Sequence, residues 1–380
     1  MDFELSEEHQ FVRQTVREFA EKELAPGVQE RDEKQEFPYE QIKKLGELGF
    51  MGVVIPEKYG GAGLDSIAYA IVLEELSRVE AAVGTIVSVN NTLFCGGVYK
   101  FGTEEQKQKY LVPLAKGEGL GAYSLSEAGA GTDAASLKTR IVSDEDHYIV
   151  NGTKMWVSNG ANATHYIVFV TLNPELRHKG ICALIMERET EGLKIGKKEN
   201  KLGIRSSDTV ELIFDNARIP KANLLGKEGE GFKIAMAILD DGRISIAAQA
   251  VGIAQGALDA ALKYARERVQ FGKPIIDHQA IQNKLADMAT GIDAGRLLTY
   301  RAAYLRDQKK PYSKAASMAK LFCAPMSNRV ADQAVQIHGG YGYLKDFNVE
   351  RFMRDAKITE IYEGTTEIQR IVIAKHLKNE

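Results

Sequence analysis

The run Tyr166-Ile167-Val168-Phe169-Val170 decides the fold of this chain, because β-branched and aromatic residues follow one another there between turn-forming residues. Two similar runs come later, Ile181-Cys182-Ala183-Leu184-Ile185 and Val210-Glu211-Leu212-Ile213-Phe214. Gly, Asn, Asp and Pro separate these runs, as expected of short strands joined by turns. The sequence therefore predicts a compact β domain over about residues 120–225.

Both parts of the chain that flank the β region show helical periodicity. Before it, the apolar residues from Leu5 to Leu24 mostly recur three, four or seven positions apart, which marks one face of a helix. Because apolar helix faces must be covered, the two helical parts are expected to form one body into which the β domain is inserted. A ligand site is expected in the crevice between them. After the β region, helices are predicted over 231–269, 280–307, 313–338 and 367–377.

The composition excludes several classes of function. The 49 Lys and Arg residues against 52 Asp and Glu residues give a net charge of −3. Without a long basic run, nucleic acid is not an expected partner. The three cysteines, Cys95, Cys182 and Cys323, are far apart, and no His cluster has metal-ligand spacing. Reduced thiols and no metal site are therefore expected.

The start of the sequence and its apolar runs bear on location. Residues Met1 to Glu8 are acidic and lead directly into a helical pattern, unlike a signal or transit peptide. Every apolar run is broken within about a dozen positions, so no membrane insertion is expected. The expected location is the cytoplasm of a bacterium, or the mitochondrial matrix if the sequence is a mature processed form.

Known short sequence motifs give little information about the function. Gly129-Ala130-Gly131-Thr132-Asp133-Ala134 fits the dinucleotide pattern G-x-G-x-x-A, but β structure rather than a helix is predicted to follow it. A nicotinamide site is therefore disfavoured, although the glycines allow a ligand to approach the backbone closely. The sequence has no G-x-S-x-G elbow, H-E-x-x-H pair or Walker loop.

Glu363 is a candidate catalytic base. It stands between Tyr362 and Gly364 in a loop that separates two helical patterns. Thr366 and Gln369 have capping-box spacing, so the following helix is predicted to begin there. A carboxylate beside a helix start that can receive a polar ligand is placed to accept a substrate proton.

Several segments together resemble the acyl-CoA dehydrogenase family. The segment Ile361 to Arg370, IYEGTTEIQR, is similar to the one that carries the family's catalytic glutamate. The resemblance runs along essentially the whole chain and implies an α+β fold. Its expected parts are an N-terminal helical domain (1–119), a middle β-barrel-like or β-sandwich domain (120–228) and a C-terminal four-helix bundle (229–380). Further similar segments are YSLSE at 123–127, GAGTD at 129–133, KMWVSNG at 154–160, RVQFG at 268–272 and QIHGG at 336–340.

The resemblance implies FAD as cofactor. Trp156 would cover one face of the flavin ring, and the Ser158 hydroxyl, which replaces the family's usual Thr, would bind near the flavin N5. Ser126 and Ala128 stand where the family has Thr and Pro. Arg268 would bind the pyrophosphate across a subunit interface, and the resemblance also implies a homotetramer built as a dimer of dimers. The residues implied in FAD binding are Tyr123, Leu125, Ser126, Trp156, Val157, Ser158, Arg268, Gln270, Phe271, Gln279, Gln336, Ile337, His338, Gly339, Gly340, Thr365 and Glu367.

The resemblance also implies the reaction. Glu363 would remove the α proton of a short-chain acyl-CoA while FAD takes the β hydride, which gives a trans-2-enoyl-CoA. Thr359 and Ile246 favour short acyl groups such as butyryl, and Gly242 occupies the position where the isovaleryl and long-chain branches carry their base. The electrons would pass to an electron-transferring flavoprotein. The implied substrate contacts are Thr132, Asp240, Arg243 and Gly364.

Two other functions remain open from the sequence. An acyl-CoA oxidase on the same fold would pass electrons to oxygen, although such enzymes commonly have longer chains. A non-catalytic homologue that binds acyl-CoA or flavin would typically lose the base or the aromatic residue at the flavin, and this chain keeps both Glu363 and Trp156.

Overall fold

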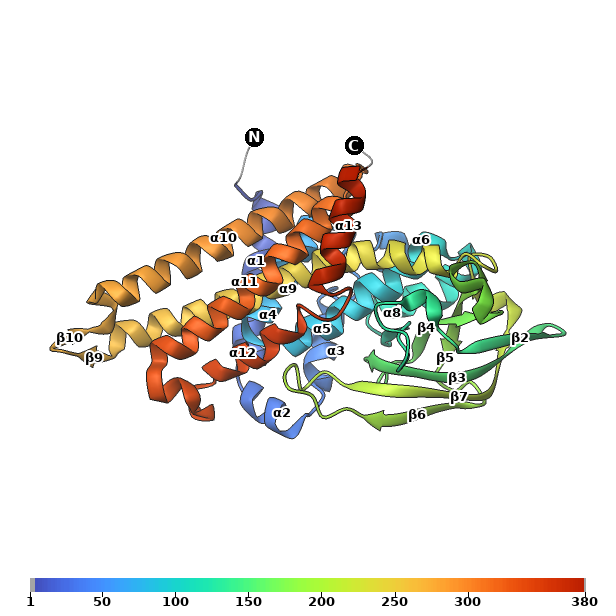
Figure 1. The fold of residues 1–380 in the computed structure, drawn as a ribbon, viewed down its shortest axis with the longest axis horizontal. Helices are drawn as coiled ribbons and strands as arrows, with labels where there is room; N and C mark the ends of the chain where they lie inside the picture. The colour runs from blue at the N-terminus through green and yellow to red at the C-terminus, as the bar shows by residue number, and fades with distance from the viewer. Residues whose placement is uncertain (1–3, 379–380) are drawn as a thin grey trace.

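The computed structural model describes residues 4–378, so residues 1–3 of the acidic N-terminal stretch and residues 379–380 of the last predicted domain lie outside the described part. The order of elements is helical, then β, then helical (Figure 1). Ser6 caps the first helix, since its hydroxyl accepts a hydrogen bond from the His9 N–H. The first block contains α1 (Glu7–Phe19), α2 (Val28–Lys34), α3 (Tyr39–Glu47), α4 (Ser66–Val79), α5 (Ala81–Ser88), α6 (Gly96–Phe101), α7 (Glu104–Gln106) and α8 (Val112–Ala115).

A wider π-helical turn, Val89–Cys95, joins α5 and α6 into one continuous helix. This helix corrects the expectation that every apolar run is short. The segment Ala81–Phe101 and the later helix α9 (Gly231–Glu267) are long and apolar enough to cross a membrane by length and composition. However, 94% and 83% of their apolar windows are buried inside the protein, so both serve as core helices here.

The β domain is a mixed sheet in the order β6-β7-β3-β2-β4-β5-β8, with β1 pairing in parallel with β4. Alternate residues of β4 serve two cores. Tyr166 and Val168 face other strands of the curled sheet, whereas Ile167 and Phe169 pack against helices. The prediction of a barrel-like or sandwich-like domain is confirmed. The strands are β1 (Gly121–Ser124), β2 (Arg140–Asp144), β3 (His147–Ser158), β4 (His165–Thr171), β5 (Ile181–Glu187), β6 (Leu193–Lys198), β7 (Thr209–Pro220) and β8 (Leu224–Leu225).

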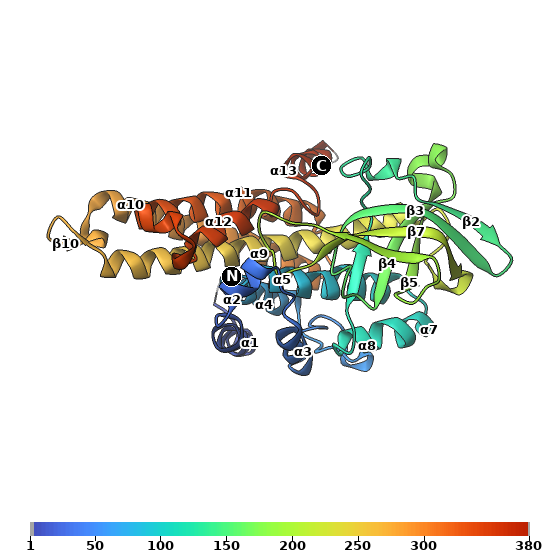
Figure 2. The ribbon, with the colours of Figure 1, turned by 90° about the horizontal axis from the view of Figure 1, so that it is seen from below.

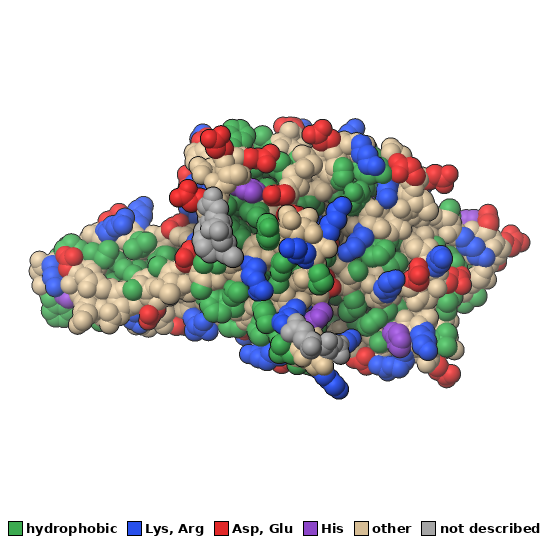
Figure 3. All heavy atoms as spheres, turned by 90° about the horizontal axis from the view of Figure 1, so that it is seen from above, with side chains coloured by type: hydrophobic (Ala, Val, Ile, Leu, Met, Phe, Trp, Pro, Cys, Tyr) green, Lys and Arg blue, Asp and Glu red, His purple; other side chains and the backbone are tan. Residues whose placement is uncertain are grey.

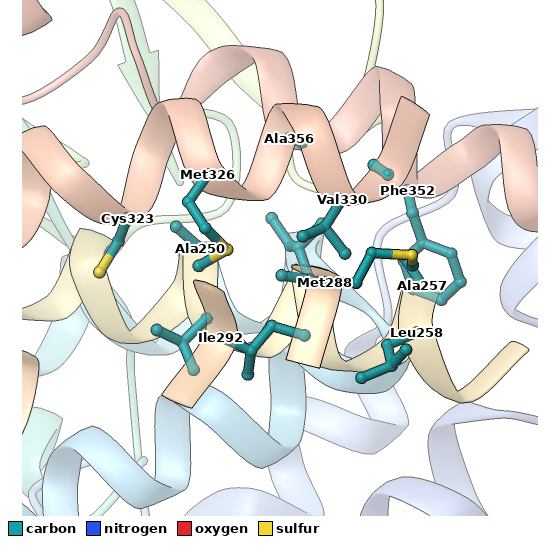
Figure 4. Packing of buried hydrophobic residues seen from close by; sticks show 14 of the residues in the cluster. Ala250, Ala257, Leu258, Met288, Ile292, Cys323, Met326, Val330, Phe352 and Ala356 are labelled. Atoms are coloured by element: carbon teal, nitrogen blue, oxygen red, sulfur yellow. The ribbon is translucent and has the colours of Figure 1, made fainter. Parts of the chain in front are cut away.

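The second helical block contains the longest helices. Their shared core is rich in Ala, Met and Ile, as Figure 4 shows for Ala250, Met288, Ile292 and Met326. Small side chains let the helices approach closely and interlock. The helices are α9, α10 (Gln279–Asp307), α11 (Ser313–His338), α12 (Val349–Ile358) and α13 (Thr366–Lys378), and a small hairpin of β9 (Val269–Gln270) and β10 (Lys273–Pro274) follows α9.

Helix α9 connects all three parts. Seen from below, it runs between the first helical block and helices α11 and α12, and its N-terminal part reaches the sheet (Figure 2). The approach to the sheet is close, since a Cβ at Gly231 would lie 2.5 Å from the backbone carbon of Cys182. The single helical body with an inserted β domain is thus confirmed. We propose domain boundaries at 119/120 and 228/229, just before β1 and α9.

Candidate active site

A cavity of about 220 Å³ lies between the sheet and the helical body. It brings together residues that are far apart in the sequence. The residues implied by the resemblance that line it are Tyr123, Leu125, Ser126, Thr132, Trp156, Ser158, Arg243, Glu363 and Gly364, and Ile246 lines it as well.

Glu363 stands in a constrained loop between α12 and α13. Its backbone has a φ of 52°, and the next residue, Gly364, has a φ of 89°. A left-handed conformation is uncommon for a non-glycine residue and typically persists where the surroundings enforce it. The loop therefore fixes the direction in which the Glu363 side chain leaves the backbone.

The helix start after Glu363 differs from the predicted capping box. The Thr365 hydroxyl, not that of Thr366, accepts from the N–H of Ile368 at 3.4 Å. The Gln369 side chain does not return to the cap, because its Nε2 donates to the carbonyl oxygens of Gly364 at 2.9 Å and Glu363 at 3.4 Å. The cap is thus displaced by one residue, and Gln369 holds the loop itself.

The electrostatic setting of Glu363 suits a base. Its Oε2 is buried and has no hydrogen-bond partner within residues 4–378. Burial raises the pKa of Glu363 to about 7, and the positive charges of Lys320 and Arg243 oppose that rise. A carboxyl group with a pKa near neutrality combines a useful ionised fraction with higher basicity than an ordinary glutamate.

Gly242 on α9 makes the room for this carboxylate. A Cβ at position 242 would lie 1.9 Å from Glu363 Oε2 and 3.3 Å from the Leu93 side chain. Any larger residue there therefore competes with Glu363 for the same space.

Gly242→Ala is expected to lower kcat/KM by about 10²-fold, because displacing a reacting group by about 1 Å has an effect of that size. Steady-state kinetics with a saturating electron acceptor would measure it. In a Glu363→Ala background the clash is gone, so the same change should stabilise α9 by roughly 0.5–1 kcal/mol in chemical unfolding. Native kcat/KM in Gly242→Ala would contradict the assigned crowding.

Trp156 is turned toward the cavity by an irregular strand. The register between β3 and β7 shifts between Lys154 and Val157, and Trp156 has a φ of 58°. Such a bulge re-aims a side chain out of the normal alternation. Trp156 is 52% exposed as a result, whereas Val157 is buried in the sheet core and does not line the cavity.

A buried ion pair anchors the adjoining loop. Lys154 has no exposed surface, and its Nζ donates to the Leu125 carbonyl at 2.9 Å and to Glu127 Oε1 at 2.8 Å. The Met155 N–H donates to the Ser126 carbonyl at 2.9 Å. The two segments that resemble flavin-binding sequences are thus tied together by backbone and charge.

Asp240 and Arg243 form the ion pair that their spacing predicts. Helix periodicity with this charge spacing is typical of an exposed helix face, but Arg243 is buried and Asp240 half-buried. Arg243 lines the cavity, whereas Asp240 lies behind it and also accepts from the Ser313 hydroxyl at 2.8 Å.

A second cavity lies at the far end of α9, beside the β9–β10 hairpin. The Arg268 guanidinium lies 5.5 Å from the centre of the Tyr341 ring. His338 stacks on Tyr264 at 4.3 Å, and its Nδ1 bonds to the Ala334 carbonyl, as expected of a structural histidine. The implied FAD residues that line this second cavity are Arg268, Gln270, Phe271, Ile337, His338, Gly339 and Gly340.

Five implied cofactor residues line neither cavity, and one of them is the buried Val157. Gln279 and Gln336 are exposed near the second cavity, while Thr365 and Glu367 lie at the start of α13 behind the Glu363 loop. Within a single chain the implied cofactor residues therefore fall into two separate groups. A Cβ at Gly339 or Gly340 would meet nothing within 4 Å, so the backbone there is open to a ligand.

Sequence reasoning missed the helical wall of the first cavity. Thr85, Ser88, Val89 and Leu93 come from α5 and the π-helical turn. A charge-free stretch that contains Asn90 and Asn91 was the available signal for a special core helix. Thr359 is fully buried, bonds to the Ala356 carbonyl and is not among the described lining residues.

Two of the lining residues, Tyr362 and Thr85, are linked by a hydrogen-bonded chain. The Tyr362 hydroxyl donates to Gln249, whose Nε2 donates to the Thr85 hydroxyl at 2.8 Å. Burial raises the pKa of Tyr362, so its hydroxyl stays protonated. Among residues 4–378, no three His, Cys, Asp or Glu side chains are grouped to hold a metal ion.

The Glu363 carboxylate and the Trp156 ring line one cavity between an inserted β domain and a helical body. The N-terminal, middle and C-terminal domains of acyl-CoA dehydrogenase match residues 6–118, 122–217 and 229–378. The chain belongs to the acyl-CoA dehydrogenase family.

Individual relatives are similar over nearly the whole length. The mitochondrial short-chain specific acyl-CoA dehydrogenase of Bos taurus is 52% identical over 374 residues, which cover 98% of this chain and 91% of that one. Butyryl-CoA dehydrogenase from Megasphaera elsdenii superimposes with a TM-score of 0.98 at 46% identity, over 100% of both chains. A chain from a structural study of the electron transferring flavoprotein of Acidaminococcus fermentans has a TM-score of 0.99 at 51% identity, again over 100% of both.

Proposed function

We propose that this chain dehydrogenates a short-chain acyl-CoA thioester to a trans-2-enoyl-CoA, with Glu363 as the base. The observation that carries the proposal is the Glu363 carboxyl, with a pKa of about 7, on the cavity that Trp156 also lines. The similarity to named short-chain and butyryl-CoA dehydrogenases supports the substrate class.

Glu363 accepts the α proton of the thioester. Removing that proton leaves negative charge on the thioester oxygen, which donors in the site must stabilise. Within residues 4–378 the Glu363 N–H makes no hydrogen bond, so it is free to donate to that oxygen. The buried Arg243 adds positive charge to the same cavity.

The hydrogen-bonded chain at the cavity supports a short acyl chain as the substrate group. Tyr362, Gln249 and Thr85 form a hydrogen-bonded wall, and a longer chain would have to displace it. Breaking buried hydrogen bonds without replacement is costly. Butyryl is the acyl group we propose.

FAD is the cofactor that we propose for both cavities. Tyr123, Leu125, Ser126, Trp156 and Ser158 would hold the flavin ring, which would supply the acceptor for the β hydride. The residues of the second cavity, with Gln279 and Gln336, would bind the remainder from a neighbouring subunit. Thr365 and Glu367 would complete the site from the start of α13.

The exposed apolar surface at the second cavity supports a homodimer within a homotetramer. Phe271 is 95% exposed at the tip of the hairpin, and Val269, Tyr343 and Leu344 are exposed beside it. Figure 3 shows hydrophobic side chains along this narrow end of the molecule. Apolar surface of this kind marks an interaction site, and a second copy of the chain is the occupant proposed here.

An electron-transferring flavoprotein is the proposed electron acceptor, on the similarity to the chain from the Acidaminococcus fermentans study. The bacterial cytoplasm, or the mitochondrial matrix, stays the predicted location.

The deciding experiment is an anaerobic titration of the purified FAD-loaded protein with acyl-CoAs of increasing length. Butyryl-CoA is expected to bleach the flavin absorbance most completely, and electron-transferring flavoprotein should restore it faster than air does. Fast reoxidation by air would favour the oxidase, and no bleaching by any acyl-CoA would favour a non-catalytic binding protein. A hexadecanoyl-CoA sample serves as the matched long-chain control.

A further inference from the structure

Helix α11 presents a polar stripe to the active site, buried at Ser317 and Lys320. Ser313, Ser317 and Lys320 are spaced i, i+4, i+7 and therefore share one helix face. Ser313 donates to Asp240 at 2.8 Å, and Ser317 accepts from Arg243 at 3.3 Å. Lys320 donates to the carbonyl of Gly364, the residue after the base. Each member of the stripe thus reaches a residue of the candidate site.

Lys320 is the member of this stripe whose burial is most unfavourable in free energy. Its side chain has no exposed surface, and burial of an ammonium group is strongly unfavourable unless it is compensated. A neutral donor would be enough to hold the Gly364 carbonyl, because Gln369 Nε2 already donates to it at 2.9 Å. Unlike Gln369, Lys320 brings a positive charge to this carbonyl.

We propose that Lys320 is a positioning residue that holds the Gly364 carbonyl and, through its charge, favours the ionised form of the Glu363 carboxylate. The inference rests on the proposed function of Glu363 as the base. It assigns to α11 a part in catalysis that the sequence motifs did not indicate.

The charges around the pair support this role. Burial lowers the pKa of Lys320 to about 8, Glu363, Glu360 and Glu367 oppose that fall, and Arg243 adds to it. Lys320 is therefore mostly charged at pH 7. Glu363 is influenced by Lys320 from α11 and Arg243 from α9. The phenols of Tyr69, Tyr123 and Tyr362 also sense Glu363, but their raised pKa values keep them neutral.

The first test is the pH profile of kcat/KM in Lys320→Met. A base must be deprotonated, so activity rises with pH through the pKa of Glu363. Loss of the cation should move this rise to higher pH, with kcat/KM about tenfold lower at pH 6 and within about twofold of the native value at pH 9.

Gln369→Leu is the matched control, since it removes a donor to the same carbonyl without changing charge. It should lower kcat/KM by a similar factor at every pH and leave the profile in place. Lys320→Arg, which keeps the charge, should restore the native profile. A Lys320→Met profile that parallels the native one at all pH values would overturn the inference.

The second test does not depend on catalysis. The pKa of Glu363 is raised in the folded state, so its contribution to stability is full below the unfolded pKa and is lost as pH rises toward the folded value. Without Lys320 the folded-state pKa of Glu363 should be higher, so this loss of stability should continue to higher pH. Unfolding midpoints between pH 5 and pH 8 should therefore fall more steeply in Lys320→Met than in the native protein.

In a Glu363→Gln background, adding Lys320→Met should no longer change this slope. If Lys320→Met is too unstable to study, Lys320→Gln takes its place against Lys320→Arg. Equal slopes for the charged and uncharged variants would refute the electrostatic role. Failure of the proposed function would appear separately, as native activity in Glu363→Gln.

Discussion

Glu363→Gln is expected to lower kcat with butyryl-CoA by about 10³- to 10⁴-fold, the upper range for loss of a general base. Gln has nearly the same shape as Glu, so the loop with φ of 52° and the space beside Gly242 should be kept. An amide has no basic lone pair of comparable strength and cannot accept the α proton. The measurement is anaerobic flavin reduction in a single turnover, which separates chemistry from reoxidation.

Glu360→Gln is the matched control for this variant. Glu360 lies three residues earlier and pairs with Lys357, and it is not among the described residues that line the cavity. It should retain kcat within about twofold, because its ion pair is partly exposed and contributes little. Flavin content and acyl-CoA affinity should be native in both variants. A Glu363→Gln protein that reduces its flavin at the native rate would remove Glu363 from the mechanism.

Lys154→Met should destabilise the protein by about 3–5 kcal/mol, since removing one member of a buried ion pair leaves the other charge unpaired. The group left behind is Glu127, which also accepts from the backbone N–H groups of Lys138 at 2.6 Å and Thr139 at 3.0 Å. The Leu125 carbonyl loses its donor as well. Chemical unfolding measures the stability, and the flavin absorbance of the purified protein reports cofactor retention.

Lys194→Met tests whether burial of the ion pair is the cause of the destabilisation expected for Lys154→Met. Lys194 pairs with Asp215 at 3.0 Å in the same sheet, but the two side chains are 63% and 59% exposed. Its loss should change the free energy of unfolding by less than about 1 kcal/mol, with full flavin content. Equal effects of the two substitutions would show that the Lys154 pair is not the anchor of the Leu125 loop.

The long elements could be predicted from the sequence because their signals are local. The helices over 231–267, 279–307 and 313–338 follow apolar periodicity, and the strands at 166–170 and 181–185 follow β-forming composition. Their packing into one body then follows from the need to cover apolar faces. Helix α12 (Val349–Ile358), a short amphipathic helix between irregular segments, was not predicted from the sequence.

The details of the site depend on long-range contacts that no local pattern contains. Trp156 lines the cavity at a point where the pairing of β3 with β7 shifts in register. The burial of Lys320 depends on a loop 44 residues later in the chain. The Glu363 assignment came from the family resemblance, whereas its near-neutral pKa required the three-dimensional surroundings.

The length of α9 determines how a change in one subunit of the proposed dimer would affect the active site of the other. Arg243 and Arg268 are 25 residues apart along this helix and its C-terminal cap, which corresponds to roughly 38 Å at 1.5 Å per residue. In the proposed dimer, this one helix would carry a substrate residue of one active site and a cofactor residue of the neighbouring subunit's active site. In the proposed dimer, a substitution of Arg268 in one copy would inactivate the active site of the other copy. In a dimer of one substituted and one native chain, the native chain would therefore be the one whose active site loses activity.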